Sequence, residues 1–234
     1  MNRIDYIREE EKKYHETCFD NYNLFEKGSW LHKPVKTVMD LLSLFEGKEE
    51  IRILDLGSGV GRNSIPVAEQ LKGRKGQVVC VDLLETALSK LKAYSKEYGV
   101  EDYIKTIGCD IGEYDICPNH YDMIVAVSTL EHVRSKDILE SVLARMADGT
   151  KLNGVNCIIM NTNVKETDLM TGQKLDALIE VNMSTEQSRD ILHQAYAGWD
   201  ILKSLVKPLE FEIQRDGKPV LLKTDCVTLV TRKK

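Results

Sequence analysis

The chain has 234 residues, with 32 basic and 37 acidic side chains and a formal net charge of −5 at pH 7. Hydrophobic residues make up 42% and charged residues 29% of the sequence, which excludes a disordered or fibrous chain. The acidic balance argues against a general nucleic-acid or membrane-surface binder, because both need a basic footprint. This length allows one large domain or two small ones, and either can bury a sizeable core without disulfides.

The six cysteines form no Cys-x-x-Cys pair and no zinc-ligand spacing. Several, such as Cys80 and Cys157, lie in apolar runs, which is typical of small core residues. No two histidines have metal-ligand spacing, so we expect no metal site. The start has no apolar signal region, and no apolar run approaches the roughly 20 residues that span a bilayer. We therefore expect a cytoplasmic protein without membrane or nucleic-acid partners.

The first 50 residues are predicted to form a helical cap or lid. Residues 3–16 have a helical pattern, and residues 17–34 are expected to form a loop with scattered aromatic side chains. Apolar positions between Val35 and Phe45 then recur at helical spacing, which predicts a further helix.

From residue 51 onward, short apolar strands alternate with amphipathic helices. The sequence predicts strands at 51–56, 77–82, 103–107, 121–127 and 155–160. Helices are predicted at 64–71 and 84–98, and a third begins after a Ser135 cap. This alternation implies right-handed crossovers and a mainly parallel sheet that is covered on both faces. Residues 51–160 are therefore expected to form the ligand-binding core.

The remaining chain divides into two parts. Residues 161–198 are expected to form a partly helical, lid-like insertion, in which Ser184 and Gln187 form a capping box. Residues 199–234 look β-rich, with strands at 199–206 and 220–231 and a turn at Asp216 and Gly217. The whole pattern predicts one α/β domain: a Rossmann-like, doubly wound, seven-stranded sheet, mostly parallel with an antiparallel C-terminal strand.

The most informative segment is 55–63 (DLGSGVGRN), which lies where the first strand leads into the first helix. Glycines in such a turn permit positive φ and let a ligand approach the backbone closely. Three glycines alone are a weak signal, because a tight strand–helix turn uses some of them anyway. Whether these glycines indicate a ligand site depends on the residues that follow the neighbouring strands.

Acidic residues follow the next two strands. Asp82 ends the second predicted strand, where a carboxylate can accept two hydrogen bonds from a ribose diol, and Asp110 follows the third. The fourth strand ends at Ser128. Either Asp can instead be a simple turn former. Because ligands of open α/β sheets bind beyond the carboxyl ends of the strands, these segments converge on one crevice and indicate a nucleoside-bearing ligand.

The glycine spacing favours one kind of nucleoside. A dinucleotide fingerprint is Gly-x-Gly-x-x-Gly, whereas here Gly57, Gly59 and Gly61 alternate and follow Asp55. A carboxylate is a poor neighbour for a pyrophosphate and suits a ligand with positive charge. S-adenosylmethionine, with its sulfonium and ammonium groups, is such a ligand.

On these residues the chain resembles the class I S-adenosylmethionine-dependent methyltransferases, specifically across 51–160. Segments 61–64 (GRNS) and 30–34 (WLHKP) are similar to the small-molecule group that includes tellurite-resistance-type methyltransferases. The resemblance implies that Gly57, Ser58 and Gly59 meet the methionyl part of the cofactor. It also implies that Asp55 orients this loop or binds the ammonium through water.

The same resemblance implies roles for the ends of the later strands. Asp82 would hold the ribose hydroxyls, and Leu83 would pack on the adenine. Asp110 would accept from the adenine amino group, and the Ile111 N–H would bond a ring nitrogen. The backbone at 127–128, formed by Val127 and Ser128, would face the ammonium. Trp30 would cover the cofactor or shape the substrate mouth, or else be ordinary core.

His132 is the best-placed candidate for a general base, because it follows the fourth strand and the ordinary pKa of histidine is about 6.5. The alternative is that it packs against the loop or cofactor without taking part in the chemistry. The resemblance implies an enzyme that transfers a methyl group to a small-molecule acceptor by in-line displacement, mainly through alignment and exclusion of water. Two other functions stay open: a non-catalytic S-adenosylmethionine-binding module and, less favoured by the glycine spacing, an NAD-dependent oxidoreductase.

Overall fold

The computed structural model describes residues 2–215 and 217–234. The helices are α1 (Arg3–Asn21), α2 (Lys36–Asp40), α3 (Ser64–Gln70), α4 (Glu85–Glu97), α5 (Lys136–Gly149) and α6 (Thr185–Ala195). The strands are β1 (Glu50–Leu56), β2 (Lys75–Asp82), β3 (Ile104–Gly108), β4 (Tyr121–Val127), β5 (Thr150–Asp168), β6 (Lys174–Leu175), β7 (Asp200–Arg215) and β8 (Lys218–Arg232). Short 3-10 turns lie at η1 (Trp30–His32), η2 (Leu41–Phe45), η3 (Glu101–Tyr103) and η4 (Leu130–His132). No helix in the described ranges combines the length and the apolar character needed to cross a bilayer.

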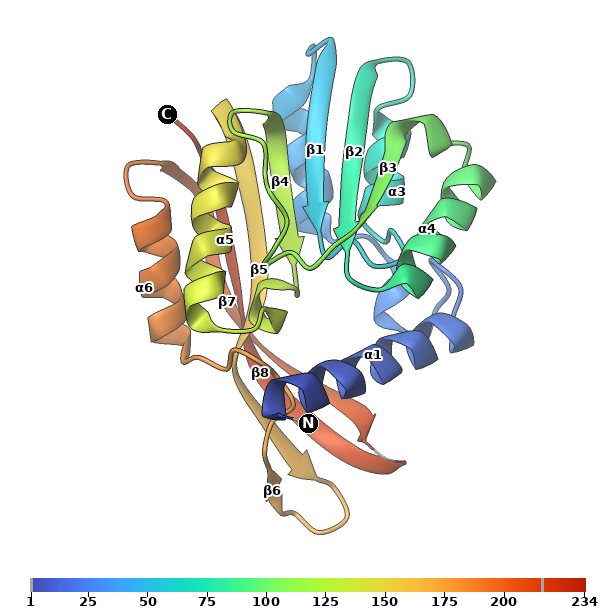
Figure 1. The fold of residues 1–234 in the computed structure, drawn as a ribbon, viewed down its shortest axis with the longest axis vertical. Coiled ribbons are helices and arrows are strands. Elements are labelled where there is room, and N and C mark those ends of the chain that lie inside the picture. The colour runs from blue at the N-terminus through green and yellow to red at the C-terminus, as the bar shows by residue number, and fades with distance from the viewer. Residues whose placement is uncertain (1, 216) are drawn as a thin grey trace.

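The strands form one sheet in the order β3-β2-β1-β4-β5-β8-β7, and β6 pairs with β5 beside this path (Figure 1). The pairs among β1 to β5 are parallel, whereas β8 is antiparallel to both β5 and β7. The predicted α/β class and the mostly parallel sheet are therefore confirmed, with β6 as a small addition. Strand order reverses between β1 and β4, and such a switch point opens a ligand crevice beyond the carboxyl ends of the strands.

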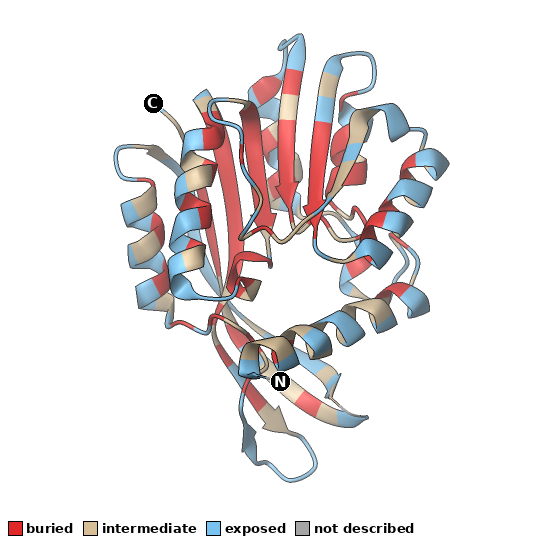
Figure 2. Ribbon diagram, in the orientation of Figure 1, coloured by how far each residue is buried: buried red, intermediate tan, exposed pale blue. Residues whose placement is uncertain are grey.

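Two apolar layers cover the faces of this sheet, and the central strands are buried along most of their length (Figure 2). Alternate residues of β1 enter different layers: Ile51 and Ile53 pack with the layer of α2, α3 and α4, whereas Leu54 and Leu56 pack with that of α5 and α6. This alternation follows from the two-residue period of a strand. The sheet is thus a rigid base for the residues at its carboxyl edge.

Local capping signals set the starts of two helices as predicted. The Ser135 side chain accepts a hydrogen bond from the backbone N–H of Ile138 at the start of α5. Ser184 and Gln187 form both bonds of a capping box at the start of α6. Each cap satisfies backbone groups that a helix end leaves without partners.

Several boundaries differ from the prediction. Helix α1 continues to Asn21, beyond the predicted end at residue 16, and its Phe19 is buried in the core. The predicted helix at 35–45 is a short α2 followed by the 3-10 turn η2. These differences arise where tertiary packing outweighs the local pattern.

The largest difference lies after residue 160. Strand β5 runs on to Asp168, so residues 161–168 form a strand, and α6 is the helical part of the predicted lid-like insertion. Strands β7 and β8 pair along nearly their whole length, out to Arg215 opposite Lys218. In the predicted turn, Gly217 has φ +73°, and Asp216 lies outside the described residues.

Candidate cofactor and active site

The glycine loop after β1 holds three residues with positive φ: Gly57 (69°), Gly59 (54°) and Gly61 (96°). A Cβ at Gly57 would lie 2.2 Å from the Thr129 Oγ1, and one at Gly61 would lie 2.3 Å from the Leu91 Cδ1. Both outer glycines are therefore required by packing. A Cβ at Gly59 would meet no atom within 4 Å. The middle of the loop thus offers an open backbone surface that a ligand can approach.

Asp82, at the carboxyl end of β2, is tied directly to this loop. Its Oδ2 accepts from the Gly59 N–H at 2.7 Å, and its Oδ1 accepts from the Leu84 N–H at 2.9 Å. Burial raises the pKa of this carboxyl, while these backbone bonds oppose the rise. A carboxylate accepts about four hydrogen bonds, so capacity remains for ribose hydroxyls. The adjacent Leu83 side chain is 51% exposed and is available to pack against a base.

The Ser58 hydroxyl is buried in the same loop, and its Oγ has no hydrogen-bond partner among the described residues. Leaving a buried polar group without a partner costs about 1–3 kcal/mol. A polar ligand atom that reached Ser58 would remove this cost. Three features fit a polar nucleoside cofactor: the Ser58 hydroxyl without a partner, the open backbone side of Gly59 and the exposed Leu83 side chain. The open side of Gly59, where a Cβ would meet no atom, is called its bare face below.

Asp55 lies beneath the loop at the end of β1 and is 4% exposed. Its Oδ2 accepts a hydrogen bond from the Ser64 hydroxyl at the start of α3. Burial raises the pKa of Asp55 to about 7, against the effect of the Ser64 bond and with a contribution from the charge of Asp82. This geometry favours the loop-orienting role over direct contact with a ligand.

Asp110, which follows β3, is shared between its own loop and helix α1. Its Oδ1 accepts from the Gly112 N–H at 2.8 Å, and its Oδ2 accepts from the Arg8 Nη1 at 2.7 Å. A second Arg8 nitrogen donates to the His132 carbonyl at 3.2 Å. The neighbouring Ile111 is 7% exposed. Asp110 keeps accepting capacity for an adenine amino group, but Arg8 is a partner that the sequence reasoning missed.

The end of β4 also shows a special backbone. Val127 is half-buried, while Ser128 is exposed and has φ +50°, which is uncommon for a residue other than glycine. The Ser128 N–H donates to the Ile159 carbonyl at 2.7 Å on β5. The backbone at 127–128 therefore lies at the same carboxyl edge as the glycine loop, Asp82 and Asp110.

His132 is held by carboxylates rather than left free. Its Nδ1 lies 3.0 Å from the Glu180 Oε2, and Glu180 is also 3.6 Å from the Arg8 Nε. Burial alone would lower the pKa of His132, but the Glu180 bond and the charges of Glu11 and Glu131 raise it to about 9. The imidazole is then protonated at neutral pH and has no lone pair to take a proton. In that state His132 would not accept a proton, and its role as a general base stays a prediction.

Helix α1 runs across the molecule beyond the carboxyl ends of β1 and β2 (Figure 1). Arg8, Glu11 and His15 recur along it at helical spacing, and this pattern is the sequence signal that could have revealed Arg8. The Glu11 Oε1 accepts from the Arg215 Nη2 at 3.0 Å, and Arg215 also donates to Glu166 at 3.1 Å. Burial lowers the pKa of His15, whose Nε2 is 3.7 Å from Glu11. Ion pairs thus join α1 to the loop after β3 and to the end of β7.

Trp30 lies between the glycine loop and α1. The guanidinium of Arg62 lies 5.3 Å from the Trp30 ring centroid, and its Nη1 donates to the Trp30 carbonyl at 2.7 Å. The ring also contacts Phe19 and His15 of α1 edge-on, with centroids 6.1 and 5.8 Å apart. Because Trp30 remains 37% exposed, it lies at the surface beside the glycine loop rather than in the hydrophobic core.

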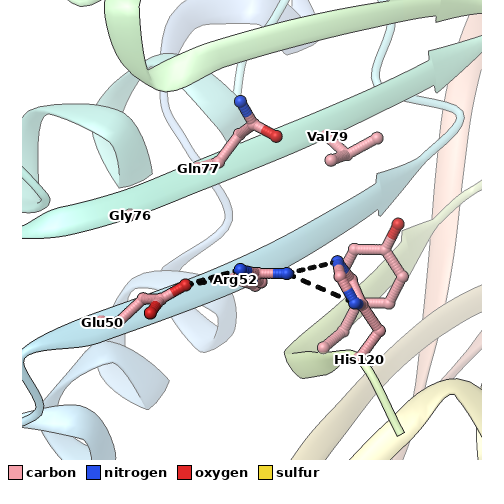
Figure 3. A pocket seen from close by; sticks show the side chains of 7 residues that line it. Glu50, Arg52, Gly76, Gln77, Val79 and His120 are labelled. Atoms are coloured by element: carbon pink, nitrogen blue, oxygen red, sulfur yellow. Dashed lines mark hydrogen bonds and ion pairs between the residues drawn. The ribbon is translucent and has the colours of Figure 1, made fainter. Parts of the chain in front are cut away.

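A separate pocket lies at the opposite edge of the sheet, near the amino ends of β1 and β2 (Figure 3). There the Arg52 Nη1 lies 3.0 Å from the His120 Nε2, and Arg52 also donates to Glu50 at 2.8 Å. Because Arg52 is already engaged on both sides, and because ligand sites of this architecture lie at the other edge, we assign no role to this pocket.

Comparisons with known proteins agree with the architecture. Residues 53–154 match the family model described as a methyltransferase domain. Carboxy-S-adenosyl-L-methionine synthase of Shewanella denitrificans is 24% identical over 125 residues, which are 53% of this chain and 49% of that protein. The chain therefore aligns with about half the length of this curated relative.

Solved structures share the fold. TehB from Haemophilus influenzae superposes with a TM-score of 0.61 and 22% identity, covering 84% of this chain and 62% of that one. The YcgJ protein from Bacillus subtilis superposes with a TM-score of 0.59 and 12% identity, covering 85% of this chain and 98% of that one. At such identities the likeness establishes the fold.

The strand order defines an α/β protein of the Rossmann-like class, an architecture in which ligands bind beyond the carboxyl ends of the strands. The family match assigns residues 53–154 to a methyltransferase domain, and the fold and the curated relative support the class I S-adenosylmethionine-dependent type. S-adenosylmethionine is the cofactor of this domain class. The class predicted from segment 55–63 is confirmed.

Proposed function

We propose that the protein transfers a methyl group from S-adenosylmethionine to a small-molecule acceptor by in-line displacement. The observation that carries this proposal is the bare face of Gly59 beside Asp82 and the unpartnered Ser58 hydroxyl. These groups lie at one edge of the sheet, in a domain whose family match covers residues 53–154.

In this proposal the ribose hydroxyls bind to Asp82, and the adenine packs on Leu83. Asp110 accepts from the adenine amino group while it keeps its bond to Arg8. The backbone N–H of Ile111 is the second donor to the base. The methionyl part lies along 57–59 and reaches the backbone at 127–128, and Asp55 supports this loop from below.

Bound S-adenosylmethionine supplies an electrophilic methyl group on a sulfonium whose departure leaves a neutral thioether. The protein then has to hold the acceptor in line with the methyl–sulfur bond and keep water out. Both effects lower the activation barrier of methyl transfer without a chemical group of the protein taking part. In this proposal helix α1 and Trp30 perform that task. Since His132 is held protonated, we propose an acceptor that attacks without losing a proton to this residue, such as a thiolate, an oxyanion or a neutral amine.

The test is a methyl-transfer screen with cofactor labelled in its methyl group. Thiols, selenium and tellurium oxyanions, amines and phenols are offered in turn, and labelled product and S-adenosylhomocysteine are both measured. Stoichiometric label in one acceptor class supports the proposal. Tight S-adenosylhomocysteine binding with no transfer to any acceptor supports the non-catalytic binding module instead.

A second candidate function follows from the curated relative, which is a carboxy-S-adenosyl-L-methionine synthase. In that case the cofactor itself would be modified rather than consumed as a methyl donor. Mass spectrometry of the cofactor pool after incubation with carboxylic acids separates the two functions. A carboxylated cofactor would favour the second candidate, and S-adenosylhomocysteine accompanied by a methylated acceptor favours the first.

A further inference from the structure

Glu131 is a fully buried carboxylate in η4, the turn that follows β4 at the carboxyl edge of the sheet. Its Oε1 accepts hydrogen bonds from the Asn161 backbone N–H at 2.9 Å and from the Asn161 Nδ2 at 2.8 Å. Its Oε2 is also buried and has no hydrogen-bond partner in the part of the chain that the structure describes. Burial raises the pKa of Glu131, against the charge of His132 and the bonds from Asn161. Because an unpartnered buried charge is costly, the free oxygen is a site for a hydrogen-bond donor.

This carboxylate lies on the face of the sheet that α1 crosses. Ile159 of β5 packs in the layer of α2, α3 and α4, so Asn161, two residues further along the strand, lies on the same face. Arg8 of α1 donates to the carbonyl of His132, the residue directly after Glu131. Helix α1 is therefore in contact with η4, at the edge of the sheet where the proposed cofactor residues lie (Figure 1).

The cations around η4 are already paired with other carboxylates. Arg8 binds Asp110 at 2.7 Å, and the His132 Nδ1 lies 3.0 Å from Glu180. Arg215 is shared between two carboxylates, at 3.0 and 3.1 Å. None of these three cations occupies the free oxygen in η4. A donor with positive charge would therefore have to come from a ligand.

We infer that the Glu131 Oε2 binds the amino group of the methyl acceptor, so that the acceptor is an amine. This inference rests on the proposed methyl transfer and narrows its substrate class. The form that reacts is the neutral amine: one N–H donates to the Glu131 Oε2, and the nitrogen lone pair is free to attack the methyl carbon. The N–C bond forms while the C–S bond breaks, and the electrons of the broken bond stay on sulfur. The products are a methylated ammonium and neutral S-adenosylhomocysteine.

A buried carboxylate suits this transfer because positive charge moves from sulfur to the acceptor nitrogen. Placed beside that nitrogen, Glu131 stabilises the charge where it develops, and burial makes the interaction stronger than it would be in water. Glu131 itself takes no proton in this step. The same carboxylate repels a thiolate or an oxyanion, which are the other acceptors compatible with a protonated His132.

The burial of Glu131 sets the route by which an acceptor arrives. Its side chain is 0% exposed, so an amine reaches the Oε2 only when a covering element moves. Helix α1, which contacts η4 through Arg8, is the element whose opening would admit it. Closure of α1 afterwards would exclude water from the reacting atoms.

Calorimetry on the full chain saturated with S-adenosylhomocysteine tests the amine site without requiring methyl transfer. The probes are propylamine, benzylamine and 1,4-diaminobutane, each compared with the alcohol of the same carbon skeleton. We expect at least one amine to bind about 10-fold or more tightly than its alcohol, because only the amine brings a positive charge to the buried carboxylate.

Two variants then locate the binding group. Glu131→Gln keeps the Oε1 that Asn161 binds and replaces Oε2 by an amide nitrogen. The amine should bind about 10- to 100-fold more weakly to it, whereas the affinity for S-adenosylhomocysteine should not change. The control Glu166→Gln removes the same charge from another buried carboxylate, but one that Arg215 already binds, so it should weaken amine binding less. Circular dichroism establishes that both variants are folded.

Several results would overturn the inference. They are a panel in which no amine binds better than its alcohol, an unchanged amine affinity in folded Glu131→Gln, and equal losses in the two variants. A loss of S-adenosylhomocysteine affinity in Glu131→Gln as large as the loss for the amine would assign the Oε2 to the cofactor instead.

The amine site and the proposed function fail in different ways. Methyl transfer to thiols or oxyanions but not to amines would overturn the amine inference and leave the methyltransferase activity in place. Amine binding that depends on Glu131, without transfer to any acceptor, would contradict the activity and leave the amine site in place.

Discussion

At the residue scale, Asp82 is the residue of the proposed site whose role follows most directly from its hydrogen bonds. It binds the Gly59 and Leu84 N–H groups and retains capacity for the ribose. Asp82→Ala should weaken S-adenosylhomocysteine binding by about 1–3 kcal/mol, the cost of unpaired hydrogen bonds. Isothermal calorimetry measures this change, and Asp115→Ala, an exposed loop carboxylate, is the control. Unchanged affinity in a folded Asp82→Ala protein would remove Asp82 from the site.

His132 makes a second prediction, which concerns stability and pH. Its folded-state pKa is about 9 against an ordinary 6.5, so protonation favours the folded state. The stabilisation is complete below pH 6.5 and is lost as the pH rises through 9. His132→Gln should therefore reduce the free energy of unfolding in urea more below pH 6.5 than above pH 9. Exposed His193, substituted as His193→Gln, serves as the control for a histidine without a buried carboxylate partner, and equal losses at both extremes in His132→Gln would refute the assigned ion pair.

At the element scale, α1 lies over the proposed site, and Arg8 makes the main contacts between α1 and the rest of the chain. Its contacts are Asp110, the His132 carbonyl and Glu180. A hydrogen bond to a charged group contributes about 1.5–3 kcal/mol, so Arg8→Gln should make opening of α1 about 10- to 100-fold more frequent. Stopped-flow fluorescence should then show faster S-adenosylhomocysteine association and release.

The control for this prediction is Arg3→Gln, on the same helix. Arg3 pairs with Asp176 at 3.3 Å, but both side chains are at least half exposed, so its loss should change the rates little. Hydrogen exchange along α1 gives an independent readout. If the ligand-binding and hydrogen-exchange rates change equally in both variants, Arg8 does not stabilise the closed position of α1 more than Arg3 does.

Elements with strong local signals were predictable from the sequence. The apolar run of β1, the glycine loop and the Ser135 cap each depend on neighbours within a few residues, and they fixed the core and the cofactor edge. The continuation of β5 beyond residue 160 was not predictable in this way. Its later part pairs with β8, where Asp168 lies opposite Val220, and no local pattern records such a distant partner.

The same distinction applies to the site. Asp82 and Asp110 follow strands, and their position along one edge follows from the parallel topology. Arg8, by contrast, is 102 residues from Asp110 in the sequence, and His132 is 48 residues from Glu180. The general-base hypothesis for His132 depended on an unperturbed imidazole. The carboxylates that change its pKa come from elements whose arrangement the sequence pattern does not give.

At the scale of the whole molecule, the parallel strands carry the proposed cofactor residues at their carboxyl ends, and α1 and the long strands β5, β7 and β8 lie around them. Ion pairs from Arg8 and Arg215 connect these parts across the site. A ligand that binds there should therefore raise the free energy of unfolding of the whole chain, and not only the stability of the glycine loop. The folded state binds it, and the unfolded chain has no such site.

Thermal unfolding tests this expectation and the choice of cofactor together. S-adenosylhomocysteine at 100 times its Kd should stabilise the folded state by about 2.7 kcal/mol. For a chain of this size, 1 kcal/mol raises Tm by about 2–4 °C, so the expected shift is roughly 5–11 °C. NAD at the same concentration should leave Tm unchanged, because the alternating glycines at 57, 59 and 61 depart from the Gly-x-Gly-x-x-Gly spacing that binds a pyrophosphate. A shift with NAD and none with S-adenosylhomocysteine would favour the oxidoreductase. Asp82→Ala should reduce the shift at fixed ligand concentration, which links the response of the whole molecule to the one carboxylate at the end of β2.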